Sequence, residues 1–374
     1  MSGAIHFAVT HSSAGGLREL WDDLAEGLAE RGHRVARFAL YPPADPEGEG
    51  GDRSRWHHIA AARPRGVLAG LRLVVALVRY LRRERPAVIV TAMPAANVLL
   101  PIAVALARVP TRIVLSHHSP TDTHNPHLDR IDGWTGSLPS VAAVVSVSDA
   151  VAATLAHKPA RYRAKRVTIH NALSRSVEQL VDSLAARAAT PDPGRCRIVA
   201  LGRLTAQKNY PMLIRAVAAV PQVELELIGA GEDEAMLRTL AAELGAAERI
   251  RFTGWLPRAA ALERAASADL FAQVSRYEGH SLALVEAARL GLPLIVSDVP
   301  VQIEGVTARD GTCCGHVVPL DDVAVLATVI AALAQDPAAR RDGAARARRL
   351  GREASHDRML DRYEAVLAPL SALR

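Results

Sequence analysis

The chain has 374 residues, enough for two ordinary domains, and 49% of them are hydrophobic, which excludes a disordered chain. Its net charge of +6 comes from the first half, because residues 1–172 carry 21 Lys and Arg against 14 Asp and Glu, whereas the remainder carries 24 against 25. Three cysteines without a CxxC pair argue against a disulfide framework or a zinc site and favour a reducing compartment. Because the N-terminus has no basic segment followed by a long apolar core, we expect no signal peptide and a cytoplasmic location.

Strand-like and helix-like segments alternate through the first half of the chain. Apolar strands are predicted at residues 5–10, 35–40, 87–91, 112–116, 141–147 and 166–169, with helices at 17–31 and 97–107. The uncharged stretch 86–107 is long enough to span a bilayer, but Pro94, Asn97 and Pro101 favour a buried strand followed by a helix.

The same alternation resumes after an Ala-rich segment, 177–193, in which we predict a linker and the boundary between two domains. Strands are predicted at 197–201, 223–228, 250–252, 270–273 and 294–297. Apolar strands that alternate with helices indicate parallel sheets covered on both faces. The predicted fold class is therefore α/β, with two Rossmann-like doubly wound domains, 1–176 and 177–355, that face each other across a cleft and bind ligands at the carboxyl ends of their strands.

The sharpest motif is YEGHSLALVEAA at residues 277–288, which follows a strand and leads into a helix. Gly279 permits close approach of a ligand to the backbone, and the helix N-terminus offers N–H groups to phosphate or hydroxyl oxygens. Glu286 can accept hydrogen bonds from a vicinal diol such as ribose. The motif fits a strand-to-helix turn with a solvated Glu and a capping Ser equally well.

A second motif, GRLTAQKN at residues 202–209, follows the first strand of the second half. Arg203 and Lys208 share one turn, where a forked guanidinium and an ammonium can together hold a diphosphate. Each basic residue taken singly fits a solvated surface charge.

Two glycine-rich turns give weaker signals. HSSAGG at residues 11–16 precedes a helix and suits an anion or a sugar, but it lacks the GxGxxG dinucleotide pattern. Gly229 and Gly231 also follow a strand, but Glu232 and Asp233 would repel a pyrophosphate at that point.

Histidines gather after the strand at residues 112–116. His117 and His118 end it, and one of them would face the cleft; His124 and His127 lie nearby, so a metal site and a structural role both stay open.

Taken together, these motifs resemble the family 4 retaining glycosyltransferases of GT-B fold. The matching segments, in chain order, are GGLRELWDDLAEGLAERGHRV, VTIHNAL, GRLTAQKN, LIGAGEDEAML, RFTGWLP and YEGHSLALVEAARLGLPLIVSDV. The resemblance runs from residue 5 to about residue 350 and implies that a C-terminal helix, 356–374, packs back on the first domain. It also implies a cytoplasmic hexosyltransferase that moves a sugar from a UDP- or GDP-linked donor to an acceptor hydroxyl with retention.

The resemblance assigns the donor diphosphate to Arg203 and Lys208, the ribose to Glu286, and the sugar hydroxyls to Glu278. Further residues that it places at the donor are Gly16, Trp255, Gly279, His280, Ser281 and Leu282. It identifies His118, rather than His117, as the cleft histidine, which would position the donor sugar. Ser281 stands where the family has a second loop glycine, a departure that puts the local backbone geometry in doubt.

The leaving diphosphate would be stabilised by Arg203, Lys208 and helix N-termini without a metal or other cofactor, because no DxD-like pair is placed to hold Mg²⁺. The retaining family is thought to use a leaving phosphate oxygen as the base. Alternatives are a nucleotide-sugar epimerase of the same fold and a nucleotide-sugar-binding protein without turnover. Few aromatic residues accompany the basic ones, so we expect no nucleic-acid partner.

Residues 65–85 form a predicted amphipathic helix with six arginines (65, 72, 79, 82, 83 and 85). It suits either a core-packed helix with a solvated basic end or an anionic membrane surface on the inner face of the membrane. The acceptor is accordingly predicted to be a glycan, a lipid-linked precursor or a small natural product.

Overall fold

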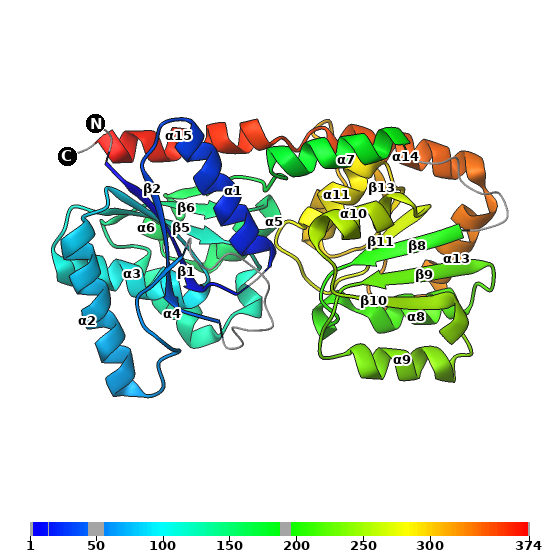
Figure 1. Ribbon diagram of the computed structural model, residues 1–374, viewed down its shortest axis with the longest axis horizontal. Helices are drawn as coiled ribbons and strands as arrows, with labels where there is room; N and C mark the ends of the chain where they lie inside the picture. Colours follow the sequence, from blue (N-terminus) through cyan, green and yellow to red (C-terminus); the bar gives the residue numbers. More distant parts are fainter. Residues whose placement is uncertain (1–2, 14, 44–55, 188–195, 373–374) are drawn as a thin grey trace. The chain divides into compact units, whose positions relative to one another are not determined.

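The computed structural model describes residues 3–13, 15–43, 56–187 and 196–372. The chain divides into two compact units (Figure 1). Unit 1 comprises Met1–Asn171 and Asp357–Arg374, and unit 2 comprises Ala172–His356. Each unit is a parallel sheet with helices on both faces, as the alternation of segments predicts.

Unit 1 contains a seven-stranded parallel sheet in the order β3-β2-β1-β4-β5-β6-β7. Its strands are β1 (Ile5–His11), β2 (Val35–Tyr41), β3 (His57–His58), β4 (Val88–Ala92), β5 (Arg112–His117), β6 (Val141–Ser146) and β7 (Arg166–Thr168). Its α-helices are α1 (Gly16–Glu30), α2 (Val67–Glu84), α3 (Pro94–Ala107), α4 (Pro126–Thr135), α5 (Asp149–Thr154), α6 (Ala160–Arg163) and α15 (His356–Ala372), and two 3-10 turns are η2 (Thr121–Thr123) and η3 (Leu155–His157).

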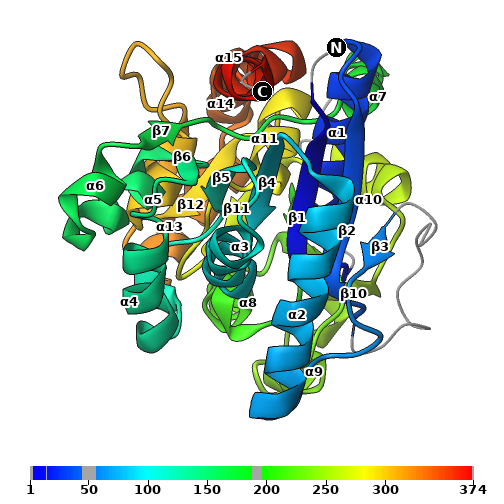
Figure 2. The ribbon, with the colours of Figure 1, turned by 90° about the vertical axis from the view of Figure 1, so that its left-hand side faces the viewer.

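Alternation along the strands divides the core of unit 1 between the two faces of the sheet. On β1, Phe7 packs against Trp21 of α1, with ring centroids 5.4 Å apart, whereas Ala8 joins Leu77 and Leu100 in the cluster under α2 and α3. Helices α2, α3 and α4 follow one another along that second face (Figure 2). The uncharged stretch 86–107 is thus β4 and α3, as predicted, and it lies in the core.

The last helix, α15, belongs to unit 1 although it lies at the far end of the chain. Glu364 accepts hydrogen bonds from Arg31 and His33, at 2.7 Å each, and Gly3 N–H donates to the carbonyl of Ser371. Tyr363, fully buried, packs edge-on against Trp21. The C-terminal segment therefore completes the hydrophobic layer that α1 begins.

Unit 2 contains a six-stranded parallel sheet in the order β10-β9-β8-β11-β12-β13. Its strands are β8 (Cys196–Leu201), β9 (Val223–Ile228), β10 (Ile250–Gly254), β11 (Leu270–Gln273), β12 (Leu294–Ser297) and β13 (Gly315–Val318). Its α-helices are α7 (Arg175–Arg187), α8 (Tyr210–Ala218), α9 (Glu234–Glu243), α10 (Arg258–Ala266), α11 (Leu282–Leu290), α12 (Pro300–Gly305), α13 (Val323–Gln335) and α14 (Pro337–Gly351), with 3-10 turns η4 (Ala206–Lys208) and η5 (Ala247–Arg249).

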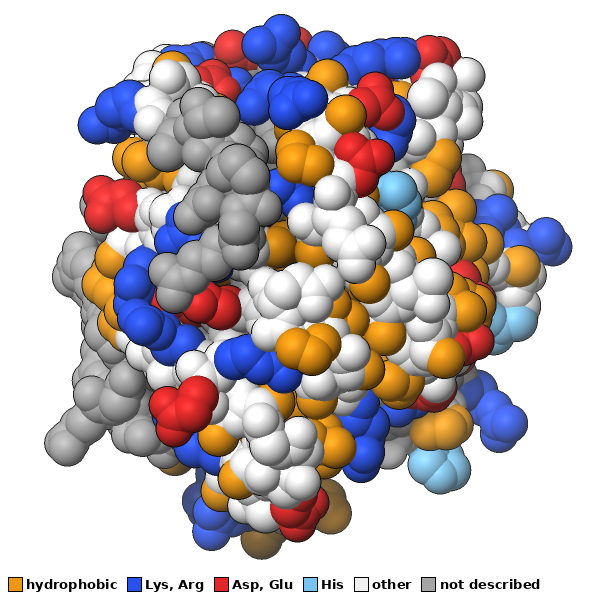
Figure 3. Space-filling model, turned by 90° about the vertical axis from the view of Figure 1, so that its right-hand side faces the viewer, with side chains coloured by type: hydrophobic (Ala, Val, Ile, Leu, Met, Phe, Trp, Pro, Cys, Tyr) orange, Lys and Arg blue, Asp and Glu red, His pale blue; other side chains and the backbone are white. Residues whose placement is uncertain are grey.

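Two hydrophobic clusters cover the two faces of the second sheet. One lies under α8, α9 and α13, and the other lies under α7, α10 and α11. Helix α13 is apolar nearly all round, and Figure 3 shows apolar side chains gathered on this end of unit 2, with lysines and arginines along its edges. Among the described helices, none alone has the length and apolarity to cross a bilayer. Helix α13 and the segment Pro337–Ala372, which are bent by 104° at the break between them, meet the test of length and composition only as a pair.

Three features of the fold differ from the sequence-based expectation. Residues 177–187 of the expected linker lie in helix α7, whose amphipathic face packs against α10 and α11; the expected linker residues 188–193 lie outside the described residues. The units therefore divide after Asn171 rather than after residue 176. The edge strands β3 and β13 were not predicted, since they are short and only partly buried.

Three glycines let two turns of unit 2 lie directly on one another. A Cβ on Gly229, whose φ is +147°, would stand 2.0 Å from the carbonyl oxygen of Gly202, and one on Gly231 would stand 2.2 Å from that of Leu204. Gly202 itself has a φ of +142° and lies against the Lys208 side chain. Gly229 and Gly231 thus serve the packing of the 202–209 turn, a role that explains them without a bound phosphate.

Adding one methyl group should have opposite effects on stability at Gly231, which is closely packed, and at Gly70, where the space is open. We expect Gly231→Ala to lower the free energy of unfolding by about 1–3 kcal/mol through overpacking. Gly70→Ala, in α2 with no atom within 4 Å of the new Cβ, should stabilise by about 0.5–1 kcal/mol. Thermal unfolding of both variants checks this, and a Gly231→Ala variant as stable as the wild type would contradict the described contact.

Candidate functional site

The order of the strands in unit 2 creates a switch point between β8 and β11, because the connections after these two strands run to opposite sides of the sheet. Strand β8 lies between β9 and β11, so the chain proceeds one way from β8 to β10 and then crosses to β11 and onward. In open α/β sheets a crevice forms outside the carboxyl ends of the two strands at such a switch point. The 202–209 turn follows β8 and the 274–281 turn follows β11, so both predicted motifs meet there.

An ion pair joins the two turns. Lys208 Nζ lies 2.7 Å from Glu278 Oε1, and Ser275 Oγ donates to the same carboxylate oxygen at 2.8 Å. Glu278 is buried, Lys208 is mostly so, and Arg203 of the same turn is exposed. The structure therefore brings the predicted diphosphate lysine and the predicted sugar carboxylate into direct contact, so that each fixes the position of the other.

Helix α11 begins at the second turn, and Ser281 is its cap. Its hydroxyl oxygen accepts from Leu284 N–H at 3.3 Å and donates to Gln273 Oε1 at 2.8 Å. The capping role that the sequence left open is thus present, and it satisfies the N–H of Leu284, one of the first residues of α11.

Glu286 is buried in the second turn of α11, where Arg258 of α10 holds it. Arg258 Nε and Nη2 lie 2.8 and 2.7 Å from the same oxygen, Glu286 Oε1. The arginine orients the carboxylate, because a guanidinium presents its donors in a rigid fork. The sequence motif did not indicate Arg258, whose only signal is its place at the start of the helix after TGWLP.

A second set of contacts that the sequence analysis missed joins the 202–209 turn to the 274–281 turn through hydrogen bonds of Arg276 and Gln207. Arg276 Nη1 and Nη2 donate to the two carboxylate oxygens of Asp321, at 2.9 and 2.8 Å, and Nη2 also donates to Asn209 Oδ1. Asn209 has a φ of +52°, a conformation that asparagine tolerates, and it ends the turn that carries Lys208. Gln207 Nε2 donates to the carbonyl of Tyr277. Asp321 is remote in sequence, so no local pattern could have revealed it.

The remaining predicted residues divide between the two units. Trp255 follows β10 and its side chain is 65% exposed; Gly279 and His280 lie in the turn before α11, and Leu282 is the first residue of α11. Gly16 is the exposed first residue of α1 in unit 1, after Gly15 with a φ of +147°.

His117 and His118 lie at the carboxyl end of β5 in unit 1 and face opposite ways. The His118 ring packs edge-on against Trp21 at 5.1 Å, and its Nε2 lies 2.9 Å from Ser116 Oγ. The His117 ring is buried on the other face, with Nε2 2.7 Å from Tyr162 Oη. Burial lowers the pKa of His117 to about 4 and, with a smaller effect of His117, that of His118 to about 3. Both rings are therefore neutral near pH 7.

At the metal site that the sequence left open, ring nitrogens of His117 and His124 are hydrogen-bonded to protein hydroxyls. His124 Nε2 lies 2.8 Å from Ser119 Oγ, and the His124 ring stacks on that of His117 at 6.3 Å. An ammonium group, Lys158 Nζ, stands between the nearby carboxylates of Asp129 and Asp132. Among the described residues, these histidines and carboxylates do not form a group of ligand atoms that could hold a metal ion.

Two family profiles match the chain in tandem. Residues 14–176 match the one described as "Glycosyltransferase Family 4", and residues 185–350 match the one described as "Glycosyl transferases group 1". A lipopolysaccharide core biosynthesis glycosyltransferase of Rhizobium meliloti is 34% identical over 98 residues, which is 26% of this chain and 28% of that protein. A GDP-mannose-dependent phosphatidylinositol monomannoside mannosyltransferase of Mycolicibacterium smegmatis is 32% identical over 151 residues, 37% of this chain and 39% of that protein. The matched segments span less than half of these curated relatives.

Solved structures of the same fold cover the chain from end to end. A sucrose-phosphate synthase of Thermosynechococcus elongatus has a TM-score of 0.80 at 20% identity and covers all of both chains. Anabaena HepE in complex with UDP has a TM-score of 0.78 at 17% identity and covers 98% of this chain and 99% of that one. At these identities the likeness establishes the GT-B fold.

The low pKa values of the β5 histidines predict an acid-dependent loss of stability. The unfolded chain takes up protons at these rings near pH 6.5, whereas the folded chain does so only near pH 4 and pH 3, so stability falls as the pH drops from 6.5 through 4. We expect His118→Gln to flatten the dependence of Tm on pH between 7 and 4.5, and the exposed control His57→Gln to leave it as in the wild type. Parallel pH profiles for the wild type and His118→Gln would contradict this account.

Proposed function

Because the chain belongs to the family 4 glycosyltransferases of GT-B fold, we propose that it moves a sugar from a UDP- or GDP-linked donor to an acceptor hydroxyl. The observation that carries this proposal is the meeting of the 202–209 and 274–281 turns at the switch point of unit 2. There, Lys208 meets Glu278, Arg203 lies on the same turn as Lys208, and helix α11 begins, an arrangement that would suit a nucleoside diphosphate.

The donor diphosphate would be held by Arg203 and Lys208. An ammonium has three N–H donors, so Lys208 can contact a phosphate oxygen and keep its bond to Glu278. Both polar contacts of Glu278 use Oε1, and Oε2 is therefore the oxygen that would accept from a donor-sugar hydroxyl. Glu286, which Arg258 orients, would accept hydrogen bonds from the two ribose hydroxyls.

The transfer step would need no metal ion. The bond from the anomeric carbon to the diphosphate oxygen breaks, and the charge that develops on the diphosphate is stabilised by Arg203, Lys208 and the α11 N–H groups. The acceptor oxygen bonds to the same face of the sugar, and its proton passes to a phosphate oxygen of the leaving group, which gives retention. His118, neutral at pH 7, would orient the donor sugar by hydrogen bonding and would not act as the base.

This assignment predicts the effect of removing the two basic side chains. We expect Arg203→Ala and Lys208→Ala each to weaken binding of the nucleoside diphosphate by about 10–100-fold, since each removes a charge-assisted contact worth roughly 1.5–3 kcal/mol. Arg238→Ala, an exposed arginine paired with Glu234 on α9, is the matched control. Calorimetric titration measures all three, and unchanged affinity in Arg203→Ala would remove it from the site.

The acceptor would be lipid-linked, and unit 1 would meet its membrane through α2. Four apolar side chains on the first turns of this helix are exposed: Val67 by 80%, Leu68 by 73%, Leu71 by 57% and Val75 by 48%. The side chains of Arg72 and Arg79 are exposed between and beyond them, while Leu73 and Leu77 face the core. An apolar face with interspersed arginines suits the interface of an anionic bilayer, and the phosphatidylinositol acceptor in the name of one relative agrees with it.

Vesicle binding tests the α2 face. We expect the wild type to sediment with vesicles that contain phosphatidylglycerol, and less with pure phosphatidylcholine vesicles, because the arginines add electrostatic attraction. Leu68→Ser with Leu71→Ser should reduce sedimentation, whereas Met236→Ser with Leu244→Ser, also exposed but on α9 and just after it, should not. Equal sedimentation of the two double variants would contradict a membrane role for α2.

A further inference from the structure

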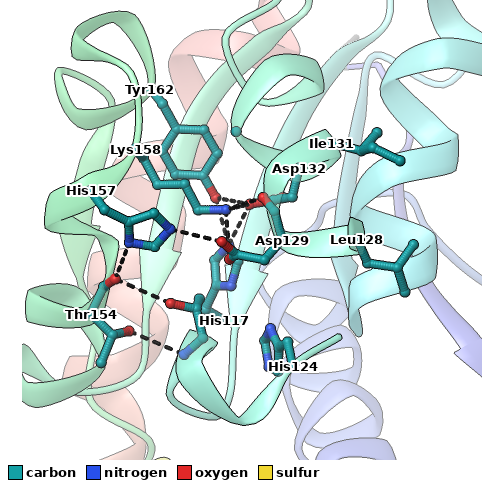
Figure 4. A network of polar contacts seen from close by, with 12 residues as sticks. His117, His124, Leu128, Asp129, Ile131, Asp132, Thr154, His157, Lys158 and Tyr162 are labelled. Atoms are coloured by element: carbon teal, nitrogen blue, oxygen red, sulfur yellow. Dashed lines mark hydrogen bonds and ion pairs between the residues drawn. The ribbon is translucent and has the colours of Figure 1, made fainter. Parts of the chain in front are cut away.

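A network of polar groups, several of them buried, contacts His117 at the end of β5 in unit 1, and the transfer mechanism above does not use it (Figure 4). We infer that Tyr162 and His117 are positioning residues, which fix the end of β5 and so hold the His118 ring where the transfer step needs it. The inference rests on the proposed function, in which His118 contacts the donor sugar.

The network begins at an ion cluster in which Asp129 and Asp132 of α4 meet Lys158, the residue that follows η3. Lys158 Nζ lies 2.7 Å from Asp129 Oδ1 and 2.9 Å from Asp132 Oδ2. His157 Nε2 lies 2.7 Å from the other oxygen of Asp129. Lys158 and Asp132 are buried, so this ammonium replaces water as the partner of both carboxylates.

Counting protons fixes the direction of the next two hydrogen bonds. Tyr162 has one hydroxyl proton, and it donates that proton to Asp132 Oδ2 at 2.9 Å, since an ionised carboxylate only accepts. His117 Nε2, at 2.7 Å from the Tyr162 oxygen, must therefore be the donor in its own hydrogen bond. A neutral imidazole carries one proton, so His117 is held as the Nε2–H tautomer, with its ring plane set by Tyr162.

The segment after His118 is fastened to the same cluster. Thr121 N–H donates to Thr154 Oγ1 at 3.2 Å, and Thr121 Oγ1 donates to the Thr154 carbonyl at 3.1 Å. The same carbonyl of Thr154 also lies 2.8 Å from His157 Nδ1. The network thus holds the polypeptide on both sides of His118, at His117 before it and at Thr121 after it.

His118 follows His117 directly and leaves the strand on the other face, against Trp21. Because neighbouring side chains share a peptide group, a rotation of the His117 ring and backbone would turn the His118 side chain as well. Removing the Tyr162 hydroxyl would leave the buried Nε2–H of His117 without its acceptor, a loss that favours such a rotation. A misplacement of about 1 Å at a reacting group costs up to about 100-fold in rate.

The competing explanation is that the cluster only stabilises unit 1. The chain offers a matched control for this alternative, because a second tyrosine–histidine pair is buried in the same unit. Tyr80 Oη, on α2, lies 2.8 Å from His6 Nδ1, on β1. A purely structural role predicts the same consequences for Tyr162→Phe and Tyr80→Phe.

The test measures release of UDP or GDP from the nucleotide sugar that the wild-type protein turns over. We expect Tyr162→Phe to lower kcat by about 10-fold or more with the KM for the donor changed less than about twofold, and Tyr80→Phe to leave both nearly unchanged. His117→Gln, whose amide N–H can replace Nε2–H, should keep more of kcat than His117→Leu. Equal kinetics for Tyr162→Phe and Tyr80→Phe, or for the two His117 variants, would overturn the inference.

Nitrogen NMR of histidine-labelled protein separates this inference from the proposed function. We expect the wild type to show His117 as the Nε2–H tautomer, and Tyr162→Phe, but not Tyr80→Phe, to shift the His118 ring signals. A wild-type protein that releases no nucleoside diphosphate from any nucleotide sugar would refute the proposed function. In that case unmoved His118 signals in Tyr162→Phe would refute the positioning role as well, and shifted signals would support it.

Discussion

The candidate donor site depends on one close contact, the approach of the 229–231 turn to the 202–204 turn beside β8. A side chain on Gly229 or Gly231 would occupy the space of backbone oxygens, so only glycine allows the two turns to meet. Gly202 in this contact lies against the Lys208 side chain, and Lys208 Nζ in turn lies 2.7 Å from Glu278 Oε1. Removing one member of such a buried pair costs about 3–5 kcal/mol, because the other charge is left without a partner. The site is thus preorganised by packing before any donor arrives.

The same principle appears in unit 1 with different chemistry. There a lysine between two aspartates, rather than glycine packing, fixes the segment around His118. In both units the residue proposed to contact substrate lies on a turn after the carboxyl end of a parallel strand, and an ion pair with buried members helps to hold that turn. Such support lets a side chain on a turn hold the geometry that rigid strands otherwise provide.

The sequence was sufficient to predict the α/β fold, because apolar strands and amphipathic helices give local signals that repeat along the chain. Short apolar stretches located strands such as β8 and β12. Local signals failed for helix α7, where Ala-rich, polar composition resembled a linker although one face packs on α10 and α11.

For the site, the motifs indicated Arg203, Lys208, Glu278 and Glu286. The structure joins Lys208 to Glu278, holds Glu286 through Arg258, and leaves Arg203 exposed on the turn that carries Lys208. Their partners Arg258, Arg276 and Asp321 could not be predicted, because each contact joins residues that lie far apart in the sequence. The network of His117, Tyr162 and Lys158 escaped notice for the same reason. Sequence motifs mark residues that can touch a ligand, whereas the residues that hold them in place emerge only from the fold.

The measurement that tests the central claim most directly is a calorimetric titration of the wild-type chain with UDP, GDP, ADP and NAD, each with and without Mg²⁺. The account predicts that one nucleoside diphosphate binds without the metal and that Glu286→Ala, which lacks the proposed ribose contact, loses this binding. Binding of NAD alone, or of none of the four, would contradict a donor site at the switch point of unit 2.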